Sequence, residues 1–94
     1  MVLHTHNIQS CSQKMLNMVQ SKHLLGVVES LIGPDIILHH TKLFLKPPKI
    51  GSAFLLHQDW SCFPTQSNSM VAAVVHISKS KENMGRIRLV KGSH

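Results

Sequence analysis

The chain has 94 residues, which is enough for one small domain or for part of a larger one. It is 43% hydrophobic and 15% charged, a composition that indicates a core-forming chain and excludes a disordered one. The formal net charge is +6, with the basic residues spread along the chain and not gathered in a block. This charge would favour the binding of an anionic small molecule, or it belongs to an ordinary solvated surface. No zinc-finger spacing, recognition helix or aromatic stacking platform is present, so no nucleic-acid partner is expected.

The sequence offers no membrane span or signal peptide. The longest apolar run, Met70 to Val75, is far below the roughly 18 residues that cross a membrane. The N-terminus has neither the basic start nor the apolar core of a signal peptide. We therefore expect a soluble, intracellular protein. Cys11 and Cys62 lack metal spacing and are predicted to be free thiols.

The first third of the chain is predicted to be loop and then helix. Residues 1–12 are polar and rich in histidine, which favours a loop, and residues 13–33 show helical periodicity in two segments. Ser21 is the expected N-cap of the second segment, and Gly33-Pro34 is expected to end it. The apolar faces of both segments are predicted to lie in the core. They comprise Met15, Leu16, Met18, Val19, Leu24, Val27, Val28 and Leu31.

Four strands are predicted after the helices, at residues 36–46, 53–59, 69–78 and 86–90, with a turn-rich loop at 63–68. The run from Val71 to Val75 is apolar throughout, as in a strand buried on both faces. Four such strands leave unpaired edges. The chain is therefore expected to be the front part of a larger β domain, or to self-associate through its open strand edges.

The stretch from Phe54 to Pro64 carries the candidate chemistry, because His57 and Asp59 lie two residues apart after an apolar run. In a strand, residues i and i+2 point to the same face, so the two side chains would project together. An imidazole and a carboxylate are two of the three groups in the 2-His-1-carboxylate triad that binds Fe(II). The spacing alone is weak evidence, since 8 of the 94 residues are histidine, and a surface or capping His-Asp pair is the alternative.

The third ligand is not evident from the sequence. His76 is the interior candidate, with a locally satisfied core or surface histidine as the alternative. His39 and His40 are not expected to face one site together, because adjacent strand residues point to opposite faces.

Four blocks of the sequence resemble the phytanoyl-CoA dioxygenase family. They are LIGPDI at 31–36, HHTKLFLKPP at 39–48, HQDWxxFP at 57–64 and ENMGxxxxxxGSH at 82–94, in the family's order and spacing. The resemblance implies one partial domain over residues 1–94. Its fold class is α+β or mainly β, with N-terminal helices followed by about four strands, within residues 35–94, of an incomplete double-stranded β-helix, or jelly roll.

The resemblance also implies an activity. It is that of an Fe(II)- and 2-oxoglutarate-dependent dioxygenase, with Fe(II) as metal, 2-oxoglutarate as cosubstrate and room for ascorbate as a further cofactor. His57 and Asp59 match the family's first two iron ligands. Lys42 falls where members often carry a residue lining the 2-oxoglutarate pocket, and Val74 falls near a position that is often Trp beside the cosubstrate. Both are therefore cofactor-binding candidates.

The resemblance further implies what lies beyond the matched blocks. In the family, a distal histidine and an arginine that binds 2-oxoglutarate follow the turn at Gly92-Ser93-His94 by several dozen residues, and His94 is not the iron ligand. The chain is therefore expected to be a truncated member with weak or no activity alone. The alternative is a non-catalytic module that associates with a full-length relative. The expected substrate is a small molecule, with an acyl-CoA among the options, and both cytoplasm and peroxisome stay open as locations.

Overall fold

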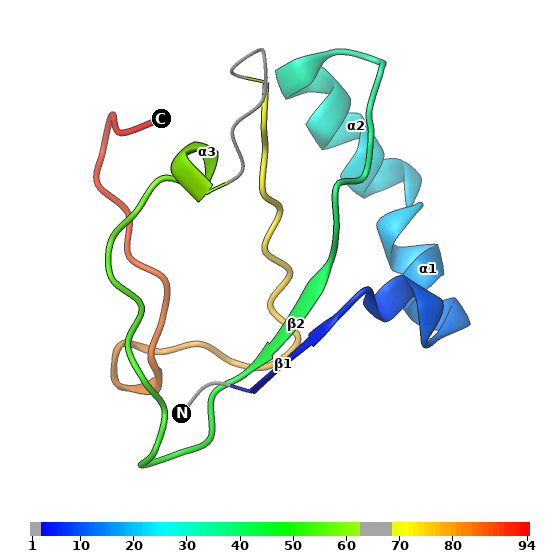
Figure 1. Ribbon diagram of the computed structural model, residues 1–94. Coiled ribbons are helices and arrows are strands. Elements are labelled where there is room, and N and C mark those ends of the chain that lie inside the picture. The colour runs from blue at the N-terminus through cyan, green and yellow to red at the C-terminus, as the bar shows by residue number, and fades with distance from the viewer. Residues whose placement is uncertain (1–2, 63–68) are drawn as a thin grey trace.

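The structure is a computed structural model that describes residues 3–62 and 69–94 (Figure 1). The loop predicted at 63–68 lies outside the described residues. Two short 3-10 turns, Ile8–Ser10 and Glu82–Met84, accompany the main elements. In chain order these are β1 (Leu3–His6), α1 (Gln13–Val19), α2 (Lys22–Ile32), β2 (Lys42–Leu45) and α3 (Asp59–Cys62).

The two predicted helical segments are confirmed, together with their boundaries. The Ser21 hydroxyl caps α2 by accepting a hydrogen bond from the Leu24 N–H at 3.3 Å. Gly33 ends α2 with φ at 91°, a conformation that glycine adopts without a steric penalty, and its N–H donates to the Glu29 carbonyl at 2.8 Å. Among residues 3–62 and 69–94, no helix is both long and apolar enough to cross a membrane.

A two-stranded antiparallel sheet joins the N-terminus to the middle of the chain. β1 pairs with β2 so that Leu3 lies opposite Leu45 and His6 lies opposite Lys42. The loop prediction for residues 1–12 is therefore wrong at residues 3–6. A polar segment with no apolar alternation forms a strand here because its backbone pairs with β2, a partner about forty residues away that local pattern does not reveal.

The junction after β1 holds the one buried hydrophobic side chain among the described residues, that of Ile8, which is 7% exposed. Thr41, the residue that precedes β2, holds this junction by hydrogen bonds. Its carbonyl accepts from the Asn7 N–H at 2.9 Å, and its hydroxyl accepts from the Ile8 N–H at 3.0 Å. The same hydroxyl donates to the Gln9 side-chain oxygen at 2.5 Å. Thr41 thus fixes the start of the helical region to the sheet.

The four-stranded arrangement predicted after the helices is not found in the described residues. Only part of the first predicted strand is present, as β2, while 53–58, 69–78 and 86–90 contain no strand. These three segments run in extended form but make no ladder of backbone hydrogen bonds (Figure 1). Val71, Val74 and Val75, expected to be buried on both faces, are 39%, 61% and 48% exposed. The structure shows a small α+β arrangement of two main helices and a two-stranded sheet.

The chain exposes much more surface than a compact protein of its mass. Its accessible area is 8392 Å², against roughly 5,400 Å² for a folded monomer of this size. Part of the additional exposed area lies on a helix face that was predicted to be buried, since Val27 and Leu31 of α2 are 51% and 65% exposed. The prediction that these two residues lie in the core is wrong, since no described element covers their side of α2.

Candidate metal centre

Aromatic contacts hold the segment that carries the candidate ligands against the sheet. The Phe44 ring of β2 meets the Phe54 ring edge to face at 5.7 Å between centroids, and it meets the His4 ring of β1 in the same way at 5.9 Å. The Lys46 ammonium lies 5.3 Å from the centroid of the Phe54 ring. Edge-to-face and cation–π geometries of this kind are attractive. Residues 53–58 are therefore attached to the sheet by side chains, although they form no strand.

The structure brings His57 and Asp59 together. His57 lies on the extended segment, and Asp59 is the first residue of α3. The His57 Nε2 and the Asp59 Oδ1 are 3.3 Å apart, and the two side chains are 50% and 46% exposed. The predicted strand is absent, but an extended backbone of any kind places residues i and i+2 on one side. The pair is open to solvent and accessible to an ion.

The contact made by the Nδ1 of His57 indicates which of the two ring nitrogens carries the proton. The Nδ1 lies 2.8 Å from the Leu55 carbonyl oxygen, which can only accept, so we infer that Nδ1 carries the proton and donates it. In the neutral ring the Nε2 then presents a lone pair toward the Asp59 carboxylate. Two acceptors in this position favour a cation between them, and a ligating histidine commonly donates its other N–H to a carbonyl in this way.

The geometry of the pair fits a metal ion. Two ligands that lie about 2.1 Å from a metal at a right angle are about 3 Å apart, close to the separation observed here. An imidazole nitrogen and a carboxylate oxygen are also the donor types that Fe(II) takes in the facial triad. The part of the chain that the structure describes holds no group of three His, Cys, Asp or Glu side chains suited to a metal. His76, the interior candidate of the sequence, is exposed and does not join the pair.

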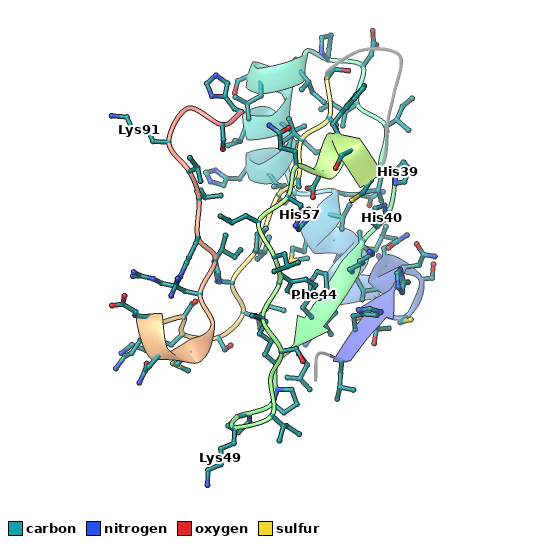
Figure 2. The ribbon with its side chains drawn as sticks, turned by 60° about the vertical axis from the view of Figure 1, so that its left-hand side comes forward. His39, His40, Phe44, Lys49, His57 and Lys91 are labelled. Carbon is teal, nitrogen blue, oxygen red and sulfur yellow. The ribbon has the colours of Figure 1, made fainter. Side chains whose placement is uncertain are left out.

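His39 and His40 differ from expectation. Their Nδ1 atoms are in direct contact, and their ring centroids are 4.7 Å apart, because residues 39–41 precede β2 and do not alternate as strand residues. Partial burial lowers the pKa of His40 below 6.5, and the neighbouring charges of His39, Lys42 and His6 lower the pKa further. The Asp59 carboxylate raises the pKa of His40, so it lies within electrostatic range of that ring. In Figure 2, His39 and His40 lie next to each other, to the right of His57.

The two residues predicted to bind the cofactor, Lys42 and Val74, lie outside the His57–Asp59 pair. Lys42 is the first residue of β2 and is half-buried. Val74 lies in the extended segment 69–78 and is mostly exposed. Their roles near 2-oxoglutarate stay predictions. Cys11 and Cys62 are free thiols, as predicted. Gly85 and Gly92, the latter at the predicted turn, have positive φ values of 71° and 78°.

A groove of about 330 Å³ lies directly beside His57. Arg88 lines it, from the segment 86–90 that was predicted to be a strand. In the structure the two arginines of this segment have separate surroundings, since Arg86 pairs with Glu82 at 3.4 Å. The i,i+4 spacing of Glu82 and Arg86 was the available signal for this separation.

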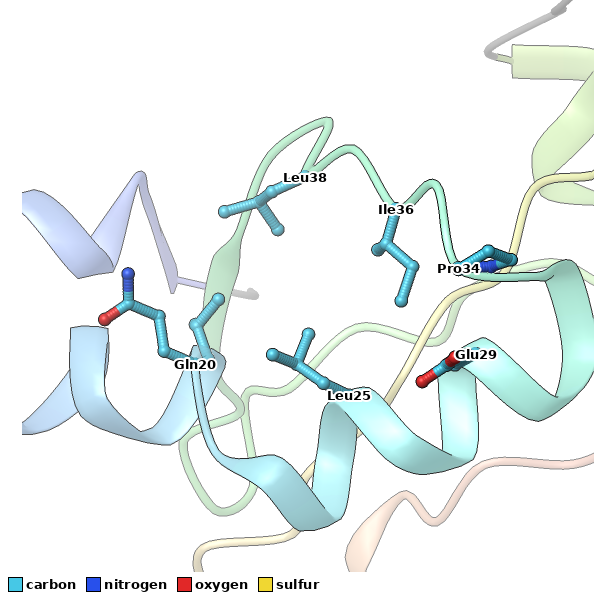
Figure 3. A pocket seen from close by; sticks show the side chains of 7 residues that line it. Gln20, Leu25, Glu29, Pro34, Ile36 and Leu38 are labelled. Atoms are coloured by element: carbon cyan, nitrogen blue, oxygen red, sulfur yellow. The ribbon is translucent and has the colours of Figure 1, made fainter.

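A second hollow, of about 430 Å³, lies between α2 and residues 34–38, with Leu25, Ile36 and Leu38 on its walls (Figure 3). It shares no residue with the groove beside His57.

Comparison with known proteins agrees with the sequence blocks. The model of the phytanoyl-CoA dioxygenase (PhyH) family matches residues 3–94. A probable alpha-ketoglutarate-dependent hypophosphite dioxygenase of Stutzerimonas stutzeri is 27% identical over 78 residues, which are 83% of this chain and 27% of that protein. The peroxisomal phytanoyl-CoA dioxygenases of Bos taurus and Homo sapiens are 39% and 36% identical over 76% of this chain and 22% of their own lengths. No solved structure matches significantly.

The chain therefore spans about a quarter of the length of the curated relatives that it matches. The family match nevertheless covers all but its first two residues. On this evidence the chain belongs to the phytanoyl-CoA dioxygenase family.

Proposed function

We propose that His57 and Asp59 are two ligands of an Fe(II) centre in a 2-oxoglutarate-dependent dioxygenase. The observation that carries the proposal is the 3.3 Å approach of the His57 Nε2 to an Asp59 carboxylate oxygen, with the His57 Nδ1 2.8 Å from the Leu55 carbonyl oxygen. The names of the relatives support the cosubstrate, because one is alpha-ketoglutarate-dependent and the others are phytanoyl-CoA dioxygenases.

Each residue of the pair has a separate task in this proposal. The Leu55 carbonyl fixes the ring of His57, so that its Nε2 is directed to the metal position without a conformational search. Asp59 supplies negative charge, which offsets part of the charge of the ion. Bound Fe(II), together with 2-oxoglutarate as electron donor and dioxygen as oxidant, would supply the chemistry that hydroxylates a C–H bond. Within the described residues the pair has no third protein ligand, so we expect weak iron binding and little turnover by these 94 residues alone.

The substrate in this proposal is a small molecule with anionic groups. Phytanoyl-CoA, named for the mammalian relatives, carries phosphates, and hypophosphite is itself a phosphorus oxyanion. A net charge of +6 favours the approach of either kind of molecule. An acyl-CoA is therefore one candidate, and a smaller phosphorus oxyanion is another.

The test of the iron site is direct metal binding without oxygen. Fe(II) and 2-oxoglutarate are added anaerobically to the purified chain, and the visible charge-transfer absorbance of the chelate is titrated. Asp59→Asn and His57→Gln should each lower the Fe(II) affinity by about tenfold or more, as lost metal-site interactions generally do. The matched controls are Asp35→Asn and His76→Gln, at exposed positions outside the pair. An unchanged affinity in Asp59→Asn would refute the proposal.

A second candidate function is that of a non-catalytic module that associates with a longer member of the family. The observation that favours it is the accessible area, about 3,000 Å² above the value for a compact monomer. That excess is larger than the roughly 800 Å² that each partner buries in a standard interface. Sedimentation velocity with a full-length relative distinguishes the two, since a module should form a defined complex. The net charge of +6 opposes self-association through open strand edges. A defined dimer in sedimentation velocity of the chain alone would establish self-association.

A further inference from the structure

The groove beside His57 is formed by two segments that are distant in the sequence. Residues 56–58 and residues 88–93 lie side by side, and the Gln58 side-chain amide joins them by donating to the Ser93 carbonyl at 2.8 Å. The groove has a volume of about 330 Å³. It is lined by Leu56, His57, Gln58, Arg88, Leu89, Val90 and Ser93. One wall therefore carries a candidate metal ligand, and the other carries a positive charge.

Arg88 is suited to bind an anion. Among the described residues, Asp59 lies against His57 and Glu82 pairs with Arg86, so Arg88 has no carboxylate partner there. Guanidinium is charged at every physiological pH, and its planar set of N–H groups matches the two oxygens of a carboxylate or phosphate. The chain has only four acidic residues to compete for this arginine. Arg88 is thus available to an external oxyanion.

Three apolar side chains of the groove are largely uncovered. Leu56, Leu89 and Val90 are 72%, 88% and 58% exposed. Apolar side chains around a single cationic group are typical of sites for small amphiphilic ligands, in which the polar group sets the orientation. An aliphatic part of the ligand would remove these three side chains from water.

We propose that Arg88 binds the oxyanion group of the substrate and that Leu56, Leu89 and Val90 contact its aliphatic part. The substrate is then a small amphiphile with a carboxylate or a phosphorus oxyanion, held with one portion against His57. This inference rests on the proposed function, because it makes the groove the substrate side of the iron centre. Arg88 acts in it as a specificity-determining residue.

The test uses three probes of equal chain length and the metal-free protein. Hexanoate and pentylphosphonate carry the two kinds of oxyanion, hexanamide is neutral, and all three have a five-carbon alkyl tail. Binding is measured by NMR titration of the amides of residues 88–93. Arg88→Gln should weaken both anions by about tenfold or more, as expected for a charge-assisted hydrogen bond. The matched control is Arg86→Gln, because Arg86 is paired with Glu82, and it should change either affinity by less than about twofold.

Hexanamide shows whether the groove survives the substitution, since its weaker binding should be the same in wild type and Arg88→Gln. Tighter binding of pentylphosphonate than of hexanoate would identify the oxyanion as phosphorus-based, and the reverse order would identify a carboxylate. Equal losses in Arg88→Gln and Arg86→Gln, or no loss in either, would overturn the inference. Asp59→Asn must leave hexanoate binding intact, so a failure of the iron site and a failure of the groove give different results.

Discussion

Thr41 is the residue whose replacement tests the architecture most directly. Thr41→Val keeps the shape of the side chain and removes its hydroxyl. The Ile8 N–H then loses its acceptor at 3.0 Å, in the most buried part of the described chain. The Gln9 side-chain oxygen also loses its donor, but it is half-buried and can turn to water. The backbone bond from Asn7 to the Thr41 carbonyl remains.

The expected cost follows from this unequal loss. A buried donor without a partner costs about 1–3 kcal/mol, whereas an acceptor that reaches water costs little. At 1.36 kcal/mol per factor of ten, the Ile8 amide should exchange its hydrogen about 5 to 160 times faster in Thr41→Val than in wild type. The amides of α2 are at a distance from this junction and should change much less.

The assay is native-state hydrogen exchange followed by NMR, residue by residue. Thr5→Val is the matched control, because Thr5 is an exposed threonine of β1, opposite Leu43. Its effect should stay within about 0.5 kcal/mol, as for most surface substitutions. If Ile8 exchanges at the same rate in Thr41→Val as in Thr5→Val, the hydroxyl does not anchor the junction and the reasoning is wrong.

Three further predictions concern stability. Ser21→Ala should destabilise α2 by about 1 kcal/mol, seen as lost helical circular dichroism in mild urea, and an unchanged signal would exclude the cap. Gly26→Ala, with open space around the new methyl group, should stabilise α2 by about 1 kcal/mol, whereas Gly85→Ala should destabilise its turn by about 1–2 kcal/mol because φ is +71°. Urea unfolding of both variants checks that the signs are opposite. The lowered pKa of His40 means that the unfolded chain binds more protons, so stability should fall as pH drops through 6.5 toward the folded-state pKa. His40→Gln should flatten this part of the profile, and an unaltered slope between about pH 8 and about pH 5 would contradict the assignment.

The features that the sequence predicted well are local ones. Ser21 and Gly33 mark the ends of α2 because capping depends on hydrogen bonds within a few residues of each end. The approach of His57 to Asp59 was also predicted, since it needs only an extended backbone across three residues. The spacing could not show that the backbone lacks strand partners, or that Asp59 begins a helix.

The features that the sequence missed depend on distant partners. β1 is polar, and it is a strand only because β2 supplies its hydrogen bonds. The apolar run at Val71 to Val75 has the composition of a buried strand, but burial needs layers on both sides that the described residues do not provide. In the same way, the groove at Arg88 arises from the contact between Gln58 and Ser93, and no local pattern encodes a contact between those two positions.

The large exposed area has a calorimetric consequence. The heat capacity change of unfolding depends on the surface that unfolding newly exposes, and it is normally about 12–15 cal/mol/K per residue. A chain that already exposes 8392 Å² has much less surface left to expose, so its heat capacity change should be well below that value. Its thermal transition should therefore be broad, with a stability curve that is nearly flat over ordinary temperatures. For such a chain, occupancy by a ligand or partner changes the folded population more than temperature does.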